Sequence, residues 1–307
     1  MKLLSGSSTP TLAKNIAKAL KILQINCDIE QFSNGEKKIW IKDELQGENV
    51  VIVQSFVNPT DETIIETLLM IDALERLGVR HVSLVIPWMG YSLQDKVFRK
   101  GEPISAKVIA DLISHSYVRR ASLMDLHNDS IPAFFGIPTS YLSALDIFAQ
   151  YIKKNFDPKQ TVVVSPDFGG LKRARSFARK LELDLINIDK DRDLKTGEVR
   201  AIDLHGEVKG KTAIVIDDVI VSGGTVVEAA NCLKQYGAKK VVFAASHALL
   251  TGNAVEKITN SEVDQTIITN TIEPKKLPKN FTVLDVSSVF AKDLSKWITN
   301  STTNNNQ

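Results

Sequence analysis

The stretch that most constrains this chain is an apolar run that ends in two aspartates and a loop of small residues. The run is Ala213 to Ile216, and Asp217 and Asp218 follow it directly. Ser222-Gly-Gly-Thr225 then leads into a segment with apolar residues at helical spacing. The pattern predicts a buried strand, a tight turn and a helix in direct succession. Such a strand-turn-helix unit is typical of α/β proteins.

The residue types in this loop indicate what it binds. Gly223 and Gly224 can adopt positive φ and let backbone N–H groups approach a ligand. Ser222 and Thr225 add hydroxyl donors at a helix start, which favours an anion such as phosphate. Asp217 and Asp218 at the strand end can accept hydrogen bonds from a sugar diol. A phosphate beside a vicinal diol predicts ribose 5-phosphate, and a plain tight turn with solvated acids is the alternative.

No Walker GxxxxGK[ST] pattern occurs in the chain, so a P-loop kinase is not indicated. The predicted ribose-phosphate loop comprises Asp217, Asp218, Val221, Ser222, Gly223, Gly224 and Thr225.

Length and charge narrow the function classes. With 307 residues, 43% of them hydrophobic, the chain can form a large core in two domains. The 38 basic and 36 acidic residues leave a net charge of +2, which does not indicate nucleic acid as a partner. Cys27 and Cys232 are predicted to be small core residues in a reducing compartment. The absence of a signal sequence and of a long apolar run predicts a soluble, cytoplasmic protein without a membrane partner.

Apolar runs alternate with helical patterns through both halves of the chain. This alternation predicts an α/β fold of two similar domains, each a mainly parallel sheet flanked by helices. The boundary is expected near Ala144, with domains at 1–144 and 145–286. A final helix at 287–298 is expected to complete the first domain, and a polar tail at 300–307 is expected to be disordered. The charged segment 189–199 is predicted to be a mobile loop.

Three further segments carry candidate side chains. Phe32, before an Asn-Gly turn, suits either the core or a stacking platform. A long polar loop after the strand at 81–87 contains the basic residues Lys96, Arg99 and Lys100, which either hold a polyphosphate or form an exposed surface. His127 lies between carboxylates just past a strand end, which suits either a metal ligand or a structural histidine.

The order of these motifs resembles that of the ribose-phosphate diphosphokinases, also called phosphoribosyl pyrophosphate (PRPP) synthetases, over nearly the whole chain. The matching stretches are Phe32–Glu36, Gln94–Lys96, Glu102–Lys107, Asp125–His127, Ser165–Asp167, Asp189 and Lys190 with Arg192, and Asp217–Thr225. The Ser-Gly-Gly-Thr loop and Lys100-Gly-Glu-Pro resemble the archaeal-type branch more closely than the common bacterial form. The resemblance implies phosphoribosyltransferase-type domains.

The resemblance also implies a reaction and a set of site residues. The family transfers the diphosphoryl group of ATP to the anomeric hydroxyl of ribose 5-phosphate and releases AMP. Mg²⁺ is implied, because the charge of ATP must be bridged and neutralised. The implied catalytic residues are Lys190 and Arg192, the implied nucleotide contacts are Phe32, Asn34, Glu36, Gln94 and Asp95, and the implied metal-site residues are His127 and Asp167. A dimer-based homo-oligomer is implied as well, with Phe32 to Glu36 reaching a neighbour's nucleotide.

One position departs from the family pattern. Where the family commonly has arginine immediately before Gln-Asp, this chain has Leu93. Two alternatives to the diphosphokinase stay open, and Leu93 favours only the second of them. One is a phosphoribosyltransferase, which uses the same loop to consume PRPP, and the other is a non-catalytic homologue that binds nucleotide and regulates a partner.

Overall fold

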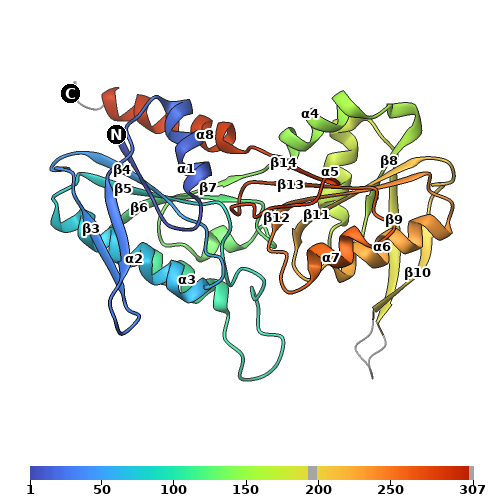
Figure 1. The fold of residues 1–307 in the computed structure, drawn as a ribbon, viewed down its shortest axis with the longest axis horizontal. Helices are drawn as coiled ribbons and strands as arrows, with labels where there is room; N and C mark the ends of the chain where they lie inside the picture. Colours follow the sequence, from blue (N-terminus) through green and yellow to red (C-terminus); the bar gives the residue numbers. More distant parts are fainter. Residues whose placement is uncertain (193–198, 304–307) are drawn as a thin grey trace. The chain divides into compact units, whose positions relative to one another are not determined.

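A computed structural model describes residues 1–192 and 199–303 of the chain and, at 190–192, 199–203 and 298–303, the backbone alone. The chain forms two compact units (Figure 1). Unit 1 comprises Met1–Ser143, Thr271–Glu273 and the C-terminal stretch from Asp285, and unit 2 comprises Ala144–Asn270 and Pro274–Leu284. None of the helices in the described ranges is long and apolar enough to cross a membrane.

Unit 1 is built on a parallel sheet of five strands in the order β1-β4-β5-β6-β7. The strands are β1 (Lys2–Ser5), β4 (Asn49–Val53), β5 (His81–Ile86), β6 (Val118–Met124) and β7 (Thr139–Leu142). Figure 1 shows α1 (Pro10–Leu20) and α8 (Ser287–Thr303) on one face of the sheet, and α2 (Thr60–Arg76) and α3 (Ser105–Ser114) on the other. The short 3-10 helix η1 (Ile131–Phe134) precedes β7. Because helices cover both faces, the central strands are apolar on both sides.

A separate antiparallel hairpin consists of β2 (Cys27–Gln31) and β3 (Lys37–Ile41). It forms a two-stranded sheet of its own, and β3 packs against α2. The Asn-Gly turn predicts a strand at 38–42 directly after it, and the second strand of the hairpin matches this prediction to within one residue. The first was not predicted, because Cys27-Asp-Ile-Glu-Gln31 has too few apolar residues to stand out as a strand.

The C-terminal helix α8 is attached to unit 1 through a buried ion pair. Arg120 on β6 lies 3.2 Å from the Asp293 carboxylate, and the Ser122 hydroxyl donates to the same carboxylate at 2.7 Å. The Arg120 guanidinium also lies 3.0 Å from the centre of the Trp297 ring. Burial lowers the pKa of Arg120 to about 10 although Asp293 opposes the shift, so the guanidinium stays charged at neutral pH.

The end of α8 corrects a sequence prediction. The helix was expected to end at Ile298 and to be followed by a disordered tail from Asn300, but α8 continues to Thr303. Its last residues include neither proline nor glycine, so nothing in the local sequence ends the helix at 298. Residues 304–307 lie outside the described part of the chain.

Unit 2 contains a larger sheet in the order β10-β9-β8-β11-β12-β13-β14. Neighbours from β9 to β14 are parallel, and β10 is antiparallel to β9. The strands are β8 (Thr161–Ser165), β9 (Leu185–Arg192), β10 (Val199–His205), β11 (Thr212–Ile220), β12 (Lys240–Ala248), β13 (Gln265–Thr269) and β14 (Phe281–Leu284).

The helices of unit 2 also lie on both sheet faces. They are α4 (Leu145–Asn155), α5 (Leu171–Leu181), α6 (Gly224–Gln235) and α7 (Ala254–Thr259), with the 3-10 helix η2 (Pro158–Gln160) before β8. Figure 1 shows α4 and α5 on one face and α6 and α7 on the other. The predicted α/β class with mainly parallel sheets is confirmed.

The segment 189–199, predicted to be a loop, is partly strand. β9 continues to Arg192 and β10 begins at Val199, and the two strands pair with each other. A hairpin exchanges backbone hydrogen bonds whatever its side chains are, so a charged sequence can form strands without contributing to a core. Residues 193–198 lie outside the described part.

The two units share one chain topology. In each, the first strand is followed by a helix, an antiparallel hairpin and a parallel strand that pairs beside the first. The series is β1-α1-β2-β3-β4 in unit 1 and β8-α5-β9-β10-β11 in unit 2. β4 therefore corresponds to β11, but it is followed by Gln54 and Ser55, and the two aspartates occur in unit 2 alone.

Candidate active site

The aspartate pair lies beyond the end of the neighbouring strand. β11 pairs with β8 only as far as Val215 opposite Val164, and it then continues to Ile220 beside β12. Asp217 and Asp218 lie within this extension, whereas the sequence predicted them at the end of the strand. β9 also runs past β8 on its other side, since their pairing ends at Asn187 opposite Ser165. The carboxyl end of β8 is thus flanked by two longer strands.

Arg173 on α5 forms ion pairs with both aspartates. Its Nη1 lies 2.9 Å from Asp218 Oδ1 and 3.7 Å from Asp217 Oδ1. All three side chains are largely buried, with exposed fractions of 17% for Arg173 and Asp217 and 7% for Asp218. Burial raises the pKa of the Asp217 carboxyl well above its usual range, and the charge of Asp218 adds to the shift while Arg173 opposes it. The cation therefore reduces the repulsion that two adjacent carboxylates would otherwise have.

The loop after β11 has the geometry of an anion cradle. Gly223 caps α6 with φ 78°, and an added Cβ would lie 3.2 Å from Ile258, so glycine is required there. Gly224 has no such restriction, because its nearest neighbour would be the Ser222 hydroxyl at 3.9 Å. Among the residues that the structure describes, no side chain caps this end of α6. The N–H groups of its first turn therefore remain available to a ligand.

The rest of the loop is anchored through its backbone. The Val221 carbonyl accepts a hydrogen bond from the Thr251 N–H at 2.8 Å, which ties the loop to the segment after β12. Ser222 is exposed and Thr225 is half-buried, so both predicted hydroxyl donors can reach a ligand. The structure thus brings Asp217, Asp218 and the Ser-Gly-Gly-Thr loop together as one site.

Asp167 belongs to the loop between β8 and α5. Its Oδ1 accepts a hydrogen bond from the Gly170 N–H at 2.8 Å, and the Ser165 hydroxyl donates to its backbone carbonyl at 2.7 Å. One carboxylate oxygen is thus used within the loop, and the side chain is half-buried. The same loop leads directly into the helix that carries Arg173.

Lys190 and Arg192 lie in the part of β9 that extends past β8. Their backbones pair with Ala201 and Val199 of β10. The side chains of both residues lie outside the described part of the chain. Their backbone lies at the same carboxyl end of the unit 2 sheet as Asp217 and Asp218.

The predicted nucleotide residues of unit 1 fall into two separate groups. Phe32, Asn34 and Glu36 are exposed at the turn between β2 and β3. The turn is internally bonded, since the Phe32 N–H donates to the Glu36 carbonyl at 2.8 Å and the Glu36 N–H donates to Asn34 Oδ1 at 3.2 Å. Figure 1 shows this hairpin and the loop between β5 and α3 projecting separately from unit 1.

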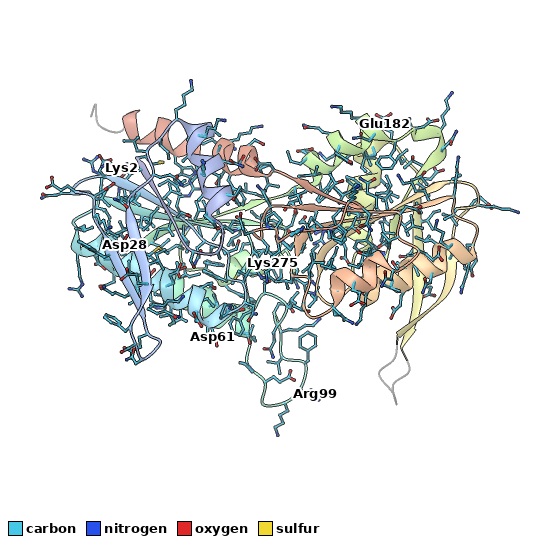
Figure 2. All side chains as sticks on the ribbon, viewed as in Figure 1. Lys2, Asp28, Asp61, Arg99, Glu182 and Lys275 are labelled. Carbon is cyan, nitrogen blue, oxygen red and sulfur yellow. The ribbon has the colours of Figure 1, made fainter. Side chains whose placement is uncertain are left out.

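Gln94 and Asp95 are held inside the loop between β5 and α3. The Ser105 hydroxyl donates to the Gln94 side-chain oxygen, and the Asn128 amide donates to the Asp95 carboxylate. Asp95 is therefore connected to the residue that follows His127, and His127 itself is exposed. Arg99, labelled in Figure 2, lies near the far end of this loop. Lys96 and Lys100 of the same loop are also exposed.

Comparison with known proteins identifies the family. Residues 1–116 match the model for the N-terminal domain of ribose phosphate pyrophosphokinase, and residues 193–304 match the phosphoribosyl synthetase-associated domain. The ribose-phosphate pyrophosphokinase of Campylobacter jejuni is 37% identical over 304 residues, covering 99% of this chain and 97% of the relative. That of Fusobacterium nucleatum is 40% identical, covering 98% and 95%. The chain belongs to the ribose-phosphate pyrophosphokinase family.

A solved structure agrees with this assignment. The crystal structure of phosphoribosylpyrophosphate synthetase from Mycobacterium smegmatis superposes with a TM-score of 0.90 at 34% identity, covering 97% of this chain and 99% of that one. The family predicted from the order of the motifs is confirmed.

Sequence reasoning about this pyrophosphokinase missed Arg173. The available signal was the basic character of the helix Leu171 to Leu181, which begins just after Ser165-Pro-Asp167. Several basic residues on that helix fit the pattern equally well, including Lys172 and Arg175. Only the fold shows that Arg173 is the one that contacts both aspartates.

Among the described residues of the pyrophosphokinase, no three His, Cys, Asp or Glu side chains are grouped as a metal site would need. The oxygen donors of the site are the carboxylate of Asp167 and those of the Asp217 and Asp218 pair. These donors fit Mg²⁺, which usually takes one or two carboxylates together with water and substrate phosphates.

Proposed function

We propose that this pyrophosphokinase transfers the diphosphoryl group of ATP to the C1 hydroxyl of ribose 5-phosphate, giving PRPP and AMP. The observation that carries the proposal is the aspartate pair beside an uncapped, glycine-rich helix start. The loop from Val221 to Thr225 would bind the 5-phosphate through backbone N–H groups and hydroxyls. Asp217 and Asp218 would accept hydrogen bonds from the ribose diol, and Arg173 would keep their combined charge compatible with a nearby phosphate.

Charge neutralisation is the main task in diphosphoryl transfer, because negative charge spreads over the migrating group. We assign this role to Lys190 and Arg192, which the fold places on an extension of β9. Phe32 would stack on the adenine, while Asn34, Glu36, Gln94 and Asp95 would contact the nucleotide.

Asp167 and His127 are the candidate residues for holding Mg²⁺, which would neutralise the polyphosphate of ATP. The predicted cytoplasmic location stays a prediction.

The test is an assay with ATP, ribose 5-phosphate and Mg²⁺ that measures AMP and PRPP. We expect both products in equal amounts, and neither when ribose 5-phosphate is omitted. A phosphoribosyltransferase would instead consume PRPP in the presence of a nucleobase. A non-catalytic homologue would bind nucleotide without releasing AMP. Release of ADP in place of AMP would contradict diphosphoryl transfer.

We propose that the enzyme is a homo-oligomer based on a dimer. The hairpin tip and the loop that carries Gln94 are both assigned to the nucleotide, yet they project separately from unit 1 (Figure 1). In a dimer, the hairpin tip of one copy can lie beside the Gln94 loop of the other copy. Apolar side chains exposed on neighbouring helices, Ile65 and Leu69 on α2 and Val108 and Leu112 on α3, support a buried contact surface.

A cavity of about 400 Å³ lies along α3, lined by Val108, Asp111, Leu112, His115 and Ser116. Its two apolar lining residues, Val108 and Leu112, belong to the same exposed surface. We expect sedimentation to show a dimer or a larger even-numbered assembly. A monomer with full activity would contradict the proposal.

Replacing Leu93 by arginine is expected to lower the Michaelis constant for ATP about tenfold. Leu93 is 37% exposed on the nucleotide loop, so an arginine fits without repacking a core. A forked guanidinium can add one charge-assisted contact of about 1.5 kcal/mol, which leucine cannot make.

Kinetics of Leu93→Arg with ATP, ADP and GTP would check this, with Val97→Arg on the same loop as the control. If neither the ATP constant nor the ranking of the nucleotides changes, Leu93 lies outside the nucleotide site.

A further inference from the structure

The β2–β3 hairpin depends on contacts outside itself for its orientation. It belongs to neither large sheet, and a two-stranded sheet alone is at most marginally stable in water. Its tip is internally bonded between Phe32 and Glu36, so the tip can move only as a unit. The direction in which the tip points is therefore set by what holds the strands beside it.

Lys37, the first residue after the tip, connects the hairpin to α2. Its ammonium lies 3.0 Å from Glu62 Oε2 and 3.5 Å from Glu66 Oε2. The Lys37 side chain is 16% exposed, and that of Glu66 is fully buried. On the opposite strand, the Gln31 amide donates to Glu62 at 3.3 Å. Both strands are thus attached to α2 immediately next to the tip. Figure 2 labels Asp28 on the hairpin and Asp61 at the start of α2, the two elements that are joined.

Glu66 in turn is fixed to the carboxyl end of the five-stranded sheet. Its carboxylate accepts hydrogen bonds from the Ser7 N–H, the Ser7 hydroxyl and the Gln54 amide, each at 2.8 Å. Ser7 follows β1 and Gln54 follows β4. A buried carboxylate with these donors occupies one fixed position. Because Lys37 pairs with this carboxylate, the hairpin is held in a fixed position relative to the sheet.

We infer that Lys37 is a positioning residue for the nucleotide, holding the Phe32–Glu36 tip in its binding orientation through Glu62 and Glu66. The inference rests on the proposed nucleotide role of the tip. A tip held in place loses less conformational freedom on binding than a free one, so the anchor favours affinity. Lys37 itself does not touch the reacting atoms, so the chemical step does not depend on it.

The structure also indicates a variant that should fold. When Lys37 is replaced by methionine, Glu66 keeps its three hydrogen bonds from Ser7 and Gln54. Glu62 is partly exposed and remains hydrated. Lys38 provides a matched control, because it is the next residue and pairs at 3.0 Å with Glu30 inside the same hairpin, without reaching α2. Lys37→Arg retains the cation and tests for rescue.

The experiment measures steady-state kinetics of the full-length enzyme with ATP and ribose 5-phosphate. For Lys37→Met we expect the KM for ATP to rise about fivefold, with kcat and the KM for ribose 5-phosphate unchanged. Lys38→Met should match the wild type, and Lys37→Arg should recover most of the ATP affinity. A residue that only stabilises the fold would lower kcat through loss of active enzyme and leave the KM for ATP unchanged.

Two outcomes would overturn the inference. One is an unchanged KM for ATP in Lys37→Met, and the other is an equal rise in Lys38→Met. Phe32→Ala separates this inference from the proposed function. If Phe32→Ala raises the KM for ATP and Lys37→Met does not, only the positioning role fails. If neither variant changes it, the nucleotide assignment of the tip fails as well.

Discussion

Turnover of the Lys190→Ala variant is expected to fall by about two to three orders of magnitude, while its affinity for ribose 5-phosphate stays at the wild-type level. A cation that acts on charge developing in the transition state changes kcat more than it changes ground-state binding. Residue 190 lies in the part of β9 that extends past the end of β8, at the same carboxyl end of the sheet as Asp217 and Asp218.

Single-turnover kinetics and calorimetry with ribose 5-phosphate would measure the two quantities for Lys190→Ala separately. Lys180→Ala is a suitable control, because Lys180 is a partly exposed lysine on α5 that pairs with Asp146 away from the site. Wild-type turnover in Lys190→Ala would remove this residue from the catalytic machinery. Equal losses in turnover and in ribose 5-phosphate affinity would assign Lys190 to substrate binding instead.

Replacing Asp217 and Asp218 together by alanine is expected to weaken ribose 5-phosphate binding by about a hundredfold. Each carboxylate would lose one charge-assisted hydrogen bond to the diol, at about 1.5 kcal/mol apiece. The sheet should survive, because these side chains lie beyond the paired part of β11 and β8. Affinity for ATP should change little by comparison.

Titration calorimetry with ribose 5-phosphate checks the aspartate prediction, and circular dichroism confirms that the double variant is folded. The control is Asp184→Ala, which removes a carboxylate that is 84% exposed in the same unit. An unchanged dissociation constant for ribose 5-phosphate in the folded double variant would refute the role of the pair in binding the diol.

The sequence alone predicted the features that depend on neighbouring residues. Two acids, a glycine pair and a helix start follow one another in the chain, so their order is local, although β11 continues past the acids to Ile220 rather than ending before them. Gly223, for example, has the positive φ that the Gly-Gly turn predicted. Apolar runs separated by helical patterns were enough to predict the α/β class, since strands covered on both faces must be apolar throughout. The order of the motifs was enough to predict the family.

The tertiary structure decided which individual side chains from distant segments meet. Arg173 was one basic residue among several on its helix until the fold placed it beside Asp217 and Asp218. Lys37 and Glu66 gave no signal in the sequence, because an exposed ion pair and a buried anchor use the same residue types. Arg120 and Asp293 likewise meet only because α8 returns to unit 1. Preferences for helix, strand and turn depend on a few neighbouring residues. Which charged side chains form a pair depends instead on which of them are buried together when the elements pack.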